Sequence, residues 1–259
     1  MQFSIENLFS VKGKVAIVTG GSRGIGYMIA RAYVENGMKV YISSRKEAAC
    51  KEVEAELSQF GECLAIAADL STEDGRKALV DFVKEREEKV DVLVNNAGAV
   101  WAAPFGEFPE IGYDKIMNIN VKALFMLSQD FLPLLQGTTE TPARIINIGS
   151  IDGIRVPSVE NFSYSASKSA VHQLTRHLAV HLGRKGIAVN AIAPGLFRSK
   201  MTEGLLDAFQ QQIERSCPLK RIGAEEDMAG MALYLASPAS SYLNGAILPL
   251  DGGLHIVNV

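Results

Sequence analysis

The side chains that point most directly to chemistry are Tyr164 and Lys168, a tyrosine and a lysine four residues apart. In a helix this spacing places both side chains on one face. A free phenol has a pKa of about 10 and is a poor acid near neutral pH, but a neighbouring ammonium favours the phenolate and lowers that pKa. We therefore expect a phenol that exchanges a proton during turnover, as a carbonyl reductase without a metal requires. Surface pairs share this spacing, so the interpretation depends on the surrounding motifs.

Short apolar segments alternate with longer segments of helical periodicity along the whole chain. Strands that are continuously apolar are typical of a parallel sheet with helices on both faces. We predict strands at 14–19, 39–43, 63–67, 90–94, 144–148, 187–192 and 246–250. We predict helices at 25–36, 46–60, 72–88, 113–135, 163–184 and 225–236.

This alternation predicts an α/β fold, a Rossmann-type doubly wound parallel sheet of about seven strands with helices on both faces. The chain has 259 residues, 47% of them hydrophobic, so we expect one domain over 1–259. Ligands in such folds bind beyond the carboxyl ends of the strands. The segment 197–218 interrupts the alternation just after a strand end, and we expect it to form a substrate lid.

Composition excludes several classes of partner. The formal net charge of −3 argues against nucleic acid. The first residues contain no basic segment followed by a long apolar one, and no later stretch is apolar enough to span a bilayer, so we expect a cytoplasmic protein without membrane association. Cys50, Cys63 and Cys217 lack metal-ligand spacing and are expected to be reduced thiols. His177 and His181 are four residues apart but lack an evident third ligand, so we predict no metal site and leave their role open.

A glycine-rich turn at 19–26 follows the first predicted strand and opens the first predicted helix. Glycine lets the backbone approach a pyrophosphate, and the amides at a helix N-terminus bind phosphate oxygens. The spacing of its glycines differs from the usual dinucleotide fingerprint. We expect this turn to bind a dinucleotide through Gly20, Ser22, Arg23, Gly24, Ile25 and Gly26.

The end of the second predicted strand selects the form of the nucleotide. A carboxylate there would bind the ribose hydroxyls of NAD, but this chain has Ser44 and Arg45, with Arg23 in the glycine turn. Guanidinium groups suit a phosphate on the ribose, so we predict NADPH/NADP as the cofactor. Asp69, followed by Leu70, comes after the third strand. Asp69 either accepts a hydrogen bond from the adenine amino group or stabilises the turn before the next helix.

Together these motifs resemble the short-chain dehydrogenase/reductase family over nearly the whole chain. The other segments that carry the resemblance are Asn-Asn-Ala-Gly at 95–98, Asn120, Ser150, Pro-Gly at 194–195 and Asp-Gly-Gly at 251–253, in the family's order. The resemblance implies a single NAD(P)-binding catalytic domain at 1–259.

The resemblance also implies a catalytic tetrad of Asn120, Ser150, Tyr164 and Lys168. Tyr164 would donate a proton to the substrate oxygen as hydride arrives from the nicotinamide, and Ser150 would hydrogen-bond that oxygen. Lys168 would lower the pKa of Tyr164 and bind the nicotinamide ribose, and Asn120 would hold a water that connects the lysine to solvent. The further cofactor contacts that the resemblance implies are Asn96, Ala97, Gly98, Pro194, Gly195, Phe197 and Ser199, besides Tyr164 and Lys168.

Apolar residues after the fourth strand and in the lid predict a hydrophobic substrate pocket. They are Trp101, Ala102, Phe105, Leu196, Phe197, Met201, Leu205, Leu206 and Phe209. Within the family the chain resembles the NADPH-dependent 3-oxoacyl carrier-protein reductases, including the reductase of the rhamnolipid pathway. We therefore predict an NADP-dependent oxidoreductase that reduces a small-molecule carbonyl, a 3-oxoacyl thioester or another hydrophobic ketone, to an alcohol.

Two other functions remain open at this point. A sugar-acid or polyol dehydrogenase of the same family would use the same four residues with a more polar pocket. A non-catalytic dinucleotide-sensing protein would keep the glycine turn without turnover. The resemblance further implies a homotetramer or homodimer built on the helices at 113–135 and 163–184.

Overall fold

The computed structural model describes residues 3–257, and these contain one parallel sheet of seven strands. The strands are β1 (Val15–Thr19), β2 (Lys39–Ser44), β3 (Cys63–Ala67), β4 (Val92–Asn95), β5 (Ala143–Ile148), β6 (Ile187–Pro194) and β7 (Ile247–Leu250). Their spatial order is β3-β2-β1-β4-β5-β6-β7, and every neighbouring pair is parallel. The order changes direction between β1 and β4, so the predicted doubly wound sheet is confirmed.

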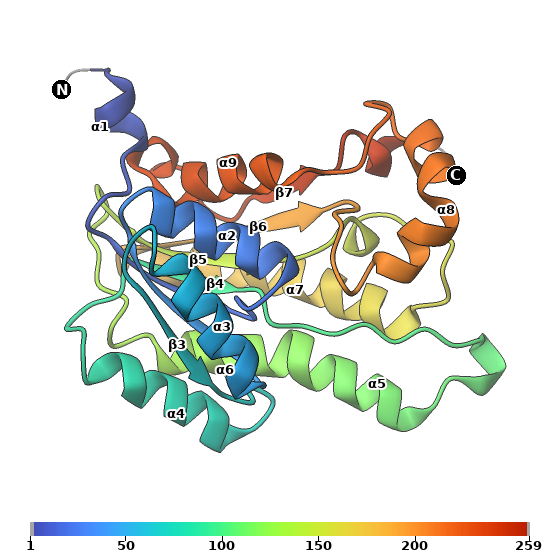
Figure 1. Cartoon of the computed structure of the whole chain (residues 1–259), viewed down its shortest axis with the longest axis horizontal. Helices are drawn as coiled ribbons and strands as arrows, with labels where there is room; N and C mark the ends of the chain where they lie inside the picture. The colour runs from blue at the N-terminus through green and yellow to red at the C-terminus, as the bar shows by residue number, and fades with distance from the viewer. Residues whose placement is uncertain (1–2, 258–259) are drawn as a thin grey trace.

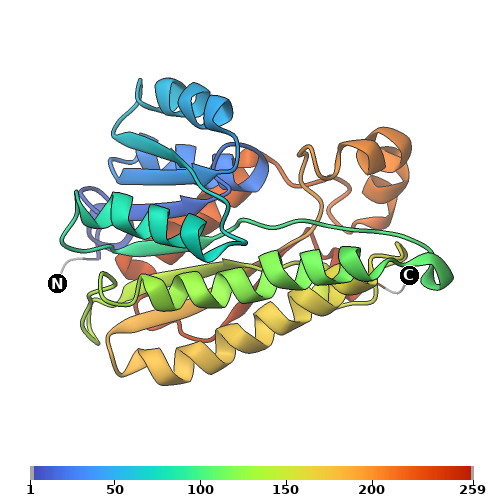
Figure 2. The same cartoon turned by 90° about the horizontal axis from the view of Figure 1, so that it is seen from below.

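Helices cover both faces of this sheet (Figures 1 and 2). One face is covered by α2 (Gly24–Glu35), α3 (Glu47–Leu57) and α9 (Glu225–Ala236), and the other by α4 (Glu73–Lys84), α6 (Ala123–Asp130) and α7 (Phe162–Gly183). Successive residues of a strand point to opposite faces, so Ala16 and Val18 pack in one core and Ile17 in the other. This double burial explains why the strands are continuously apolar in the sequence.

The long helix predicted at 113–135 differs from its prediction. It begins earlier, as α5 (Glu110–Met117), passes through a π-helical turn, η2 (Asn118–Lys122), and continues as α6 to Asp130. Figure 2 shows these parts as one rod. A π-turn admits an extra residue into a helix and is common at functional sites, and hydrophobic periodicity does not detect it. Asn120 lies within this turn.

The remaining elements are short or belong to the predicted lid. They are α1 (Ile5–Phe9), η1 (Phe105–Glu107), η3 (Ile151–Gly153), α8 (Glu203–Ser216), η4 (Pro238–Ser240) and η5 (Leu254–Ile256). Helix α8 lies within the predicted lid segment, at the end of the molecule opposite to α1 (Figures 1 and 2). The sequence analysis did not predict α1, whose five residues bury no side chain.

The three cysteines are unpaired, as predicted, and all three are buried. Across residues 3–257, no helix combines the length and the apolar character needed to cross a membrane.

Two helical glycines predict opposite effects on stability. A Cβ at Gly75, in the first turn of α4, would overlap the backbone carbonyl of Asp69, whereas nothing lies within 4 Å of a Cβ at Gly230 in α9. Alanine favours a helix over glycine by about 1 kcal/mol. We therefore expect Gly230→Ala to raise the free energy of unfolding by about 0.5 kcal/mol or more. Gly75→Ala should lower it by about 2 kcal/mol, because the backbone must shift. Urea unfolding measures both, and stabilisation by Gly75→Ala would contradict this packing.

Candidate active site

Tyr164 and Lys168 lie on one face of the first turns of α7, as predicted. The Lys168 Nζ is 5.5 Å from the centroid of the Tyr164 ring. The same ammonium donates a hydrogen bond of 2.8 Å to the carbonyl oxygen of Ile148 at the end of β5. Lys168 is buried and Tyr164 is half-buried. The end of β5 therefore holds the cation beside the phenol.

Burial dominates the acidity of both groups. It lowers the pKa of Lys168 to about 8 and raises the pKa of Tyr164 to about 12. A hydrogen bond with Ser150 opposes the rise in the tyrosine pKa, and the charge of Asp152 adds to it. Desolvation by burial therefore dominates the pKa of Tyr164, and a lowering of that pKa by Lys168 stays a prediction. At neutral pH the phenol is protonated beside a charged ammonium, which is the state that a proton donor needs.

Ser150 brings a second hydroxyl to the phenol. It lies two residues after the end of β5 and caps η3, where its Oγ accepts a hydrogen bond of 3.1 Å from the backbone N–H of Asp152. Its side chain also lies close enough to Tyr164 to lower the pKa of the phenol. Two hydroxyls, one from the N-cap of η3 and one from α7, therefore lie at one cavity, as the predicted tetrad requires.

The Asn120 side chain joins the loop after β4 to α7. Its Oδ1 accepts a hydrogen bond of 2.9 Å from the Ala99 N–H, and its Nδ2 donates to the Ala99 carbonyl at 3.0 Å and to the Ser167 Oγ at 2.9 Å. The amide is therefore committed to protein partners on both sides. Its role in holding a water for Lys168 stays a prediction.

A cavity of about 1590 Å³ follows the carboxyl ends of the strands. Ser150, Tyr164 and Lys168 line it. So do the other predicted cofactor residues with one exception: Gly20, Ser22, Arg23, Gly24, Ile25, Ser44, Arg45, Asp69, Leu70, Asn96, Ala97, Gly98, Pro194, Gly195, Phe197 and Ser199. The exception is Gly26, where a Cβ would overlap the Gly20 carbonyl and the Asn96 side chain. Gly26 thus permits close packing of helix and strand rather than direct contact.

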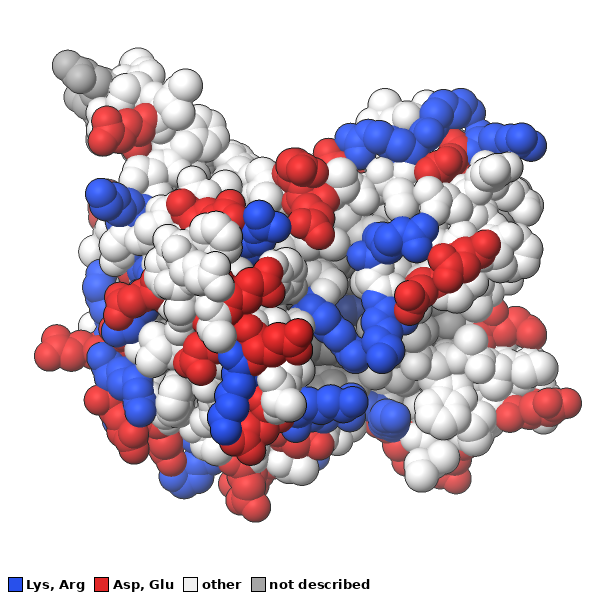
Figure 3. Space-filling model, viewed as in Figure 1, with Lys and Arg blue, Asp and Glu red and all other residues white. Residues whose placement is uncertain are grey.

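The wall of this cavity fits a long anionic ligand. Gly20 and Gly24 have φ of +66° and +55°, a region that favours glycine. Helix α2 starts at Gly24 and presents its free amide groups there, as at a phosphate site. Arg23 and Arg45 lie exposed on the wall, and Figure 3 shows Lys and Arg side chains gathered round the hollow on this face. These residues fit the phosphates of NADPH.

Helix α5 and the π-turn η2 form a wall of the cavity that the sequence motifs did not predict. Apolar residues of this wall are Met117, Ile119 and Val121, and the other residues recur at steps of three and four residues. They are Ile111, Asp114, Lys115, Asn118 and Lys122. Lys46 and Lys200 also line the cavity and were not predicted. The helical spacing is visible in the sequence, but the chain fold decides that this face meets the cavity.

Asp69 stabilises its own turn. Its Oδ1 accepts hydrogen bonds from the Ser71 N–H at 3.0 Å and from the Ser71 hydroxyl at 2.7 Å, and these hold the pKa of Asp69 below its usual range. Thr72 caps α4 instead, by accepting from the Gly75 N–H at 3.1 Å. The turn interpretation is confirmed, and the adenine contact stays a prediction for a residue that lines the cavity.

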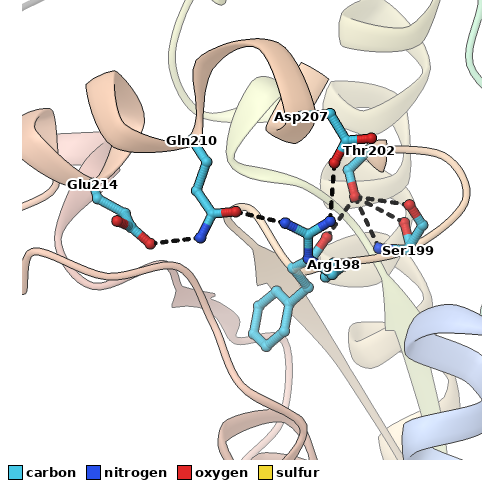
Figure 4. Close-up of polar contacts among 7 residues, drawn as sticks. Arg198, Ser199, Thr202, Asp207, Gln210 and Glu214 are labelled. Carbon is cyan, nitrogen blue, oxygen red and sulfur yellow. Dashed lines mark hydrogen bonds and ion pairs between the residues drawn. The ribbon is translucent and has the colours of Figure 1, made fainter. Parts of the chain in front are cut away.

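Helix α8, in the predicted lid segment, is tied back to the segment that leaves β6 (Figure 4). Arg198 pairs with Asp207 at 3.2 Å and donates to the Gln210 Oε1 at 2.5 Å. The Thr202 hydroxyl donates to the Phe197 carbonyl at 2.6 Å. These contacts hold the first turns of α8 against the strand end at which Phe197 and Ser199 line the cavity.

The predicted apolar pocket is assembled only in part. Phe197 and Met201 line the cavity, and Leu206 is fully buried. Phe105 and Phe209 are 80% and 53% exposed, because η1 and α8 turn them outward. The sequence could not reveal which side of these short helices faces the cavity.

His177 and His181 lie exposed on α7, with ring centroids 4.9 Å apart. Among residues 3–257, no group of three or more His, Cys, Asp or Glu side chains is arranged to hold a metal ion. The function of the pair stays open.

Comparisons with known proteins agree with this geometry. The profile of the family described as enoyl-(acyl carrier protein) reductase matches residues 20–255. The rhamnolipids biosynthesis 3-oxoacyl-[acyl-carrier-protein] reductase of Pseudomonas aeruginosa is 44% identical over 96% of this chain and 98% of its own length. The Pseudomonas aeruginosa RhlG/NADP active-site complex is a solved structure with a TM-score of 0.93 and 43% identity, over 96% of this chain and 99% of that one. The 2-dehydro-3-deoxy-D-gluconate 5-dehydrogenase of Dickeya dadantii is 39% identical over 96% of this chain and 98% of its length.

Proposed function

Because the chain belongs to the short-chain dehydrogenase/reductase family, we propose that it reduces a ketone to a secondary alcohol with NADPH and with Tyr164 as the proton donor. One observation carries the proposal: a protonated phenol, a serine hydroxyl and a buried ammonium line the cavity that also contains Arg23 and Arg45. The phenol, the hydroxyl and the ammonium can transfer or stabilise a proton, and the two arginines can bind a phosphate on the ribose of the cofactor.

Each catalytic side chain has a separate task in this proposal. NADPH supplies the hydride when it is bound. Tyr164 gives its proton to the carbonyl oxygen, and Ser150 donates a hydrogen bond to the same oxygen as negative charge develops. Lys168 stabilises the phenolate that Tyr164 becomes. Asn120 holds the loop at Ala99 in place, and a water beside it would return a proton through Lys168.

The cofactor residues divide by the part of the dinucleotide that each would hold. The glycine turn at 20–26 would bind the diphosphate, and Arg23, Ser44 and Arg45 the phosphate on the adenosine ribose. Lys168 would bind the nicotinamide ribose. Asp69, Leu70 and residues 96–98 would enclose the adenosine. Pro194, Gly195, Phe197 and Ser199 would lie against the carboxamide of the nicotinamide.

A 3-oxoacyl thioester is the substrate that we propose. The Pseudomonas aeruginosa relative is named for such a substrate. Phe197 and Met201 give the cavity an apolar wall near the lid, which suits an acyl chain. A sugar acid is the second candidate, because the Dickeya dadantii relative is named for one and the α5 wall is polar at Asp114 and Lys115.

Loss of NADPH absorbance with a panel of ketones tests the two candidates. The panel holds 3-oxoacyl thioesters of increasing chain length, as coenzyme A and carrier-protein forms, and oxo sugar acids. We expect kcat/KM for the best thioester to exceed that for every sugar acid by about a hundredfold, the order of about 3 kcal/mol of differential binding. A faster sugar acid would favour the second candidate. If the protein reduces neither the thioesters nor the sugar acids, both proposed substrate classes are wrong.

The pKa of Lys168 predicts the pH dependence of reduction. Its pKa is lowered to about 8, so the ammonium is charged below that pH and loses its proton above it, while Tyr164, with a pKa of about 12, keeps its proton throughout. We expect kcat/KM for reduction to be flat below about pH 7.5 and to fall about tenfold per unit above pH 8. Lys168→Met should be slow at every pH. If kcat/KM of Lys168→Met still falls above pH 8 as in wild type, the assignment of this pH dependence to Lys168 is wrong.

We also propose a cytoplasmic homotetramer or homodimer. The three unpaired cysteines suit a reducing compartment. Phe125 of α6 and Val180 of α7 are 38% and 72% exposed, and an apolar contact between subunits would cover them. Light scattering of the purified chain gives the mass that decides between the two assemblies.

A further inference from the structure

Asp152 contacts residues on both sides of Tyr164. Its backbone N–H donates to the Ser150 Oγ at 3.1 Å. Its carboxylate accepts a hydrogen bond of 3.0 Å from the Asn161 Nδ2, and its backbone carbonyl accepts one of 2.7 Å from the Ser165 hydroxyl. Asn161 precedes α7 and Ser165 follows Tyr164 directly. One residue of η3 therefore connects the proposed catalytic serine with both flanks of the proposed catalytic tyrosine.

The hydrogen bond that Asn161 donates to Asp152 takes the place of the usual hydrogen bond between an N-cap side chain and its helix. Asn161 occupies the N-cap position of α7, where an asparagine side chain normally accepts a hydrogen bond from the helix backbone. Here the side chain makes no such bond, and its Oδ1 has no partner although the residue is 6% exposed. A cap is worth about 1 kcal/mol to a helix. Asn161 does not make that capping hydrogen bond, and its side-chain amide bonds to Asp152 instead.

Asp152 also places a negative charge beside the phenol. The charged or titratable side chains that act on Tyr164 or Lys168 are Asp152 from η3 and, from α7, Lys168 itself and His172. The others that line the cavity are Arg23, Arg45, Lys46, Asp69, Asp114, Lys115, Lys122 and Lys200. Burial lowers the pKa of His172 to about 4, so this ring is neutral at physiological pH. Asp152 is the carboxylate whose charge raises the pKa of Tyr164.

We infer that Asp152 is a positioning residue that holds Tyr164 in place through Asn161 and Ser165 and adds its negative charge to the burial of the phenol. The inference rests on the proposed function, because Asp152 acts through the proposed proton donor. Removal of a nearby negative charge lowers the pKa of a phenol. Without the charge of Asp152 the phenol of Tyr164 therefore ionises at lower pH, whereas the alkaline limb that reports Lys168 stays in place.

Two variants separate the charge of Asp152 from its hydrogen bond. Asp152→Asn removes the charge, while its amide oxygen still accepts from Asn161. Asn161→Ala removes the hydrogen bond and keeps the charge. We expect Asp152→Asn to leave the alkaline limb of kcat/KM, which reports Lys168, in place. Asn161→Ala should lower kcat/KM about tenfold, the loss of one buried hydrogen bond, at every pH and leave the midpoint in place. Wild-type kcat/KM in Asn161→Ala would overturn the inference.

A measurement independent of turnover keeps this inference separate from the proposed function. Tyrosine labelled with ¹³C at Cζ reports phenol ionisation by NMR, and the signal that disappears in Tyr164→Phe belongs to Tyr164. We expect that signal to titrate at lower pH in Asp152→Asn than in wild type, and coincident curves would overturn the inference. A shifted curve in a chain that reduces no ketone would instead refute the proposed function alone. Fluorescence of Trp101, the single tryptophan, verifies that each variant is folded and binds NADPH.

Discussion

Replacing Tyr164 with phenylalanine is expected to lower kcat for ketone reduction about a thousandfold and to leave the affinity for NADPH close to wild type. The phenol is the group that carries a proton at neutral pH beside Ser150, and its pKa of about 12 keeps that proton in place until a substrate oxygen takes it. Phenylalanine keeps the ring against Lys168 and removes only the hydroxyl. The cavity wall that would bind the dinucleotide is then unchanged.

Stopped-flow traces of NADPH absorbance and a titration of Trp101 fluorescence measure the two quantities separately. Tyr242→Phe is the matched control, because Tyr242 is fully exposed and does not line the cavity, so both quantities should equal those of wild type. Undiminished turnover in Tyr164→Phe would eliminate the proposed mechanism. A large loss of NADPH affinity would show instead that the hydroxyl binds the cofactor.

The double replacement Ser44→Asp with Arg45→Ile is expected to reverse the cofactor preference. Both residues line the cavity beside the end of β2, and Arg45 is exposed there and able to pair with a phosphate. A carboxylate at 44 would accept hydrogen bonds from ribose hydroxyls and repel a phosphate. We expect the ratio of kcat/KM for NADPH to that for NADH to fall by at least about a hundredfold, since a charged hydrogen bond is worth about 1.5–3 kcal/mol.

The ratio of the two cofactor efficiencies is the decisive measurement, because it cancels any general loss of activity. Arg184→Ile is the control for the loss of a cation, since Arg184 is exposed at the end of α7 and does not line the cavity. Its ratio should stay at the wild-type value. An unchanged ratio in the double variant would show that a different group, such as Lys46, binds the phosphate.

Much of the site could be predicted because its parts are local in the sequence. The step from Tyr164 to Lys168 is one helical turn, and the glycine turn must follow a strand and open a helix whatever else the chain contains. The carboxyl ends of parallel strands meet at one edge, which brings residues as distant as Gly20 and Pro194 to one cavity. Resemblance to a family then supplied roles for these positions.

The features that could not be predicted depend on contacts between segments that are far apart in the sequence. The Asn120 side chain bonds with Ser167, 47 positions later, and nothing in the periodicity of either helix indicates that contact. The π-turn at η2 shares the composition of an ordinary helix. The face of α5 that lines the cavity has a visible spacing, but spacing alone does not say which neighbour it meets.

The amino-acid sequence alone determined the order of strands and helices, the glycine turn and the types of the reacting side chains, because these depend on local propensity and periodicity. Tertiary structure alone decided the acidity of those side chains. Burial raises the pKa of Tyr164 and lowers that of Lys168, the reverse of what the pair in isolation predicts for the phenol. Desolvation depends on every segment that packs round a group, so the chemistry of the phenol belongs to the folded chain.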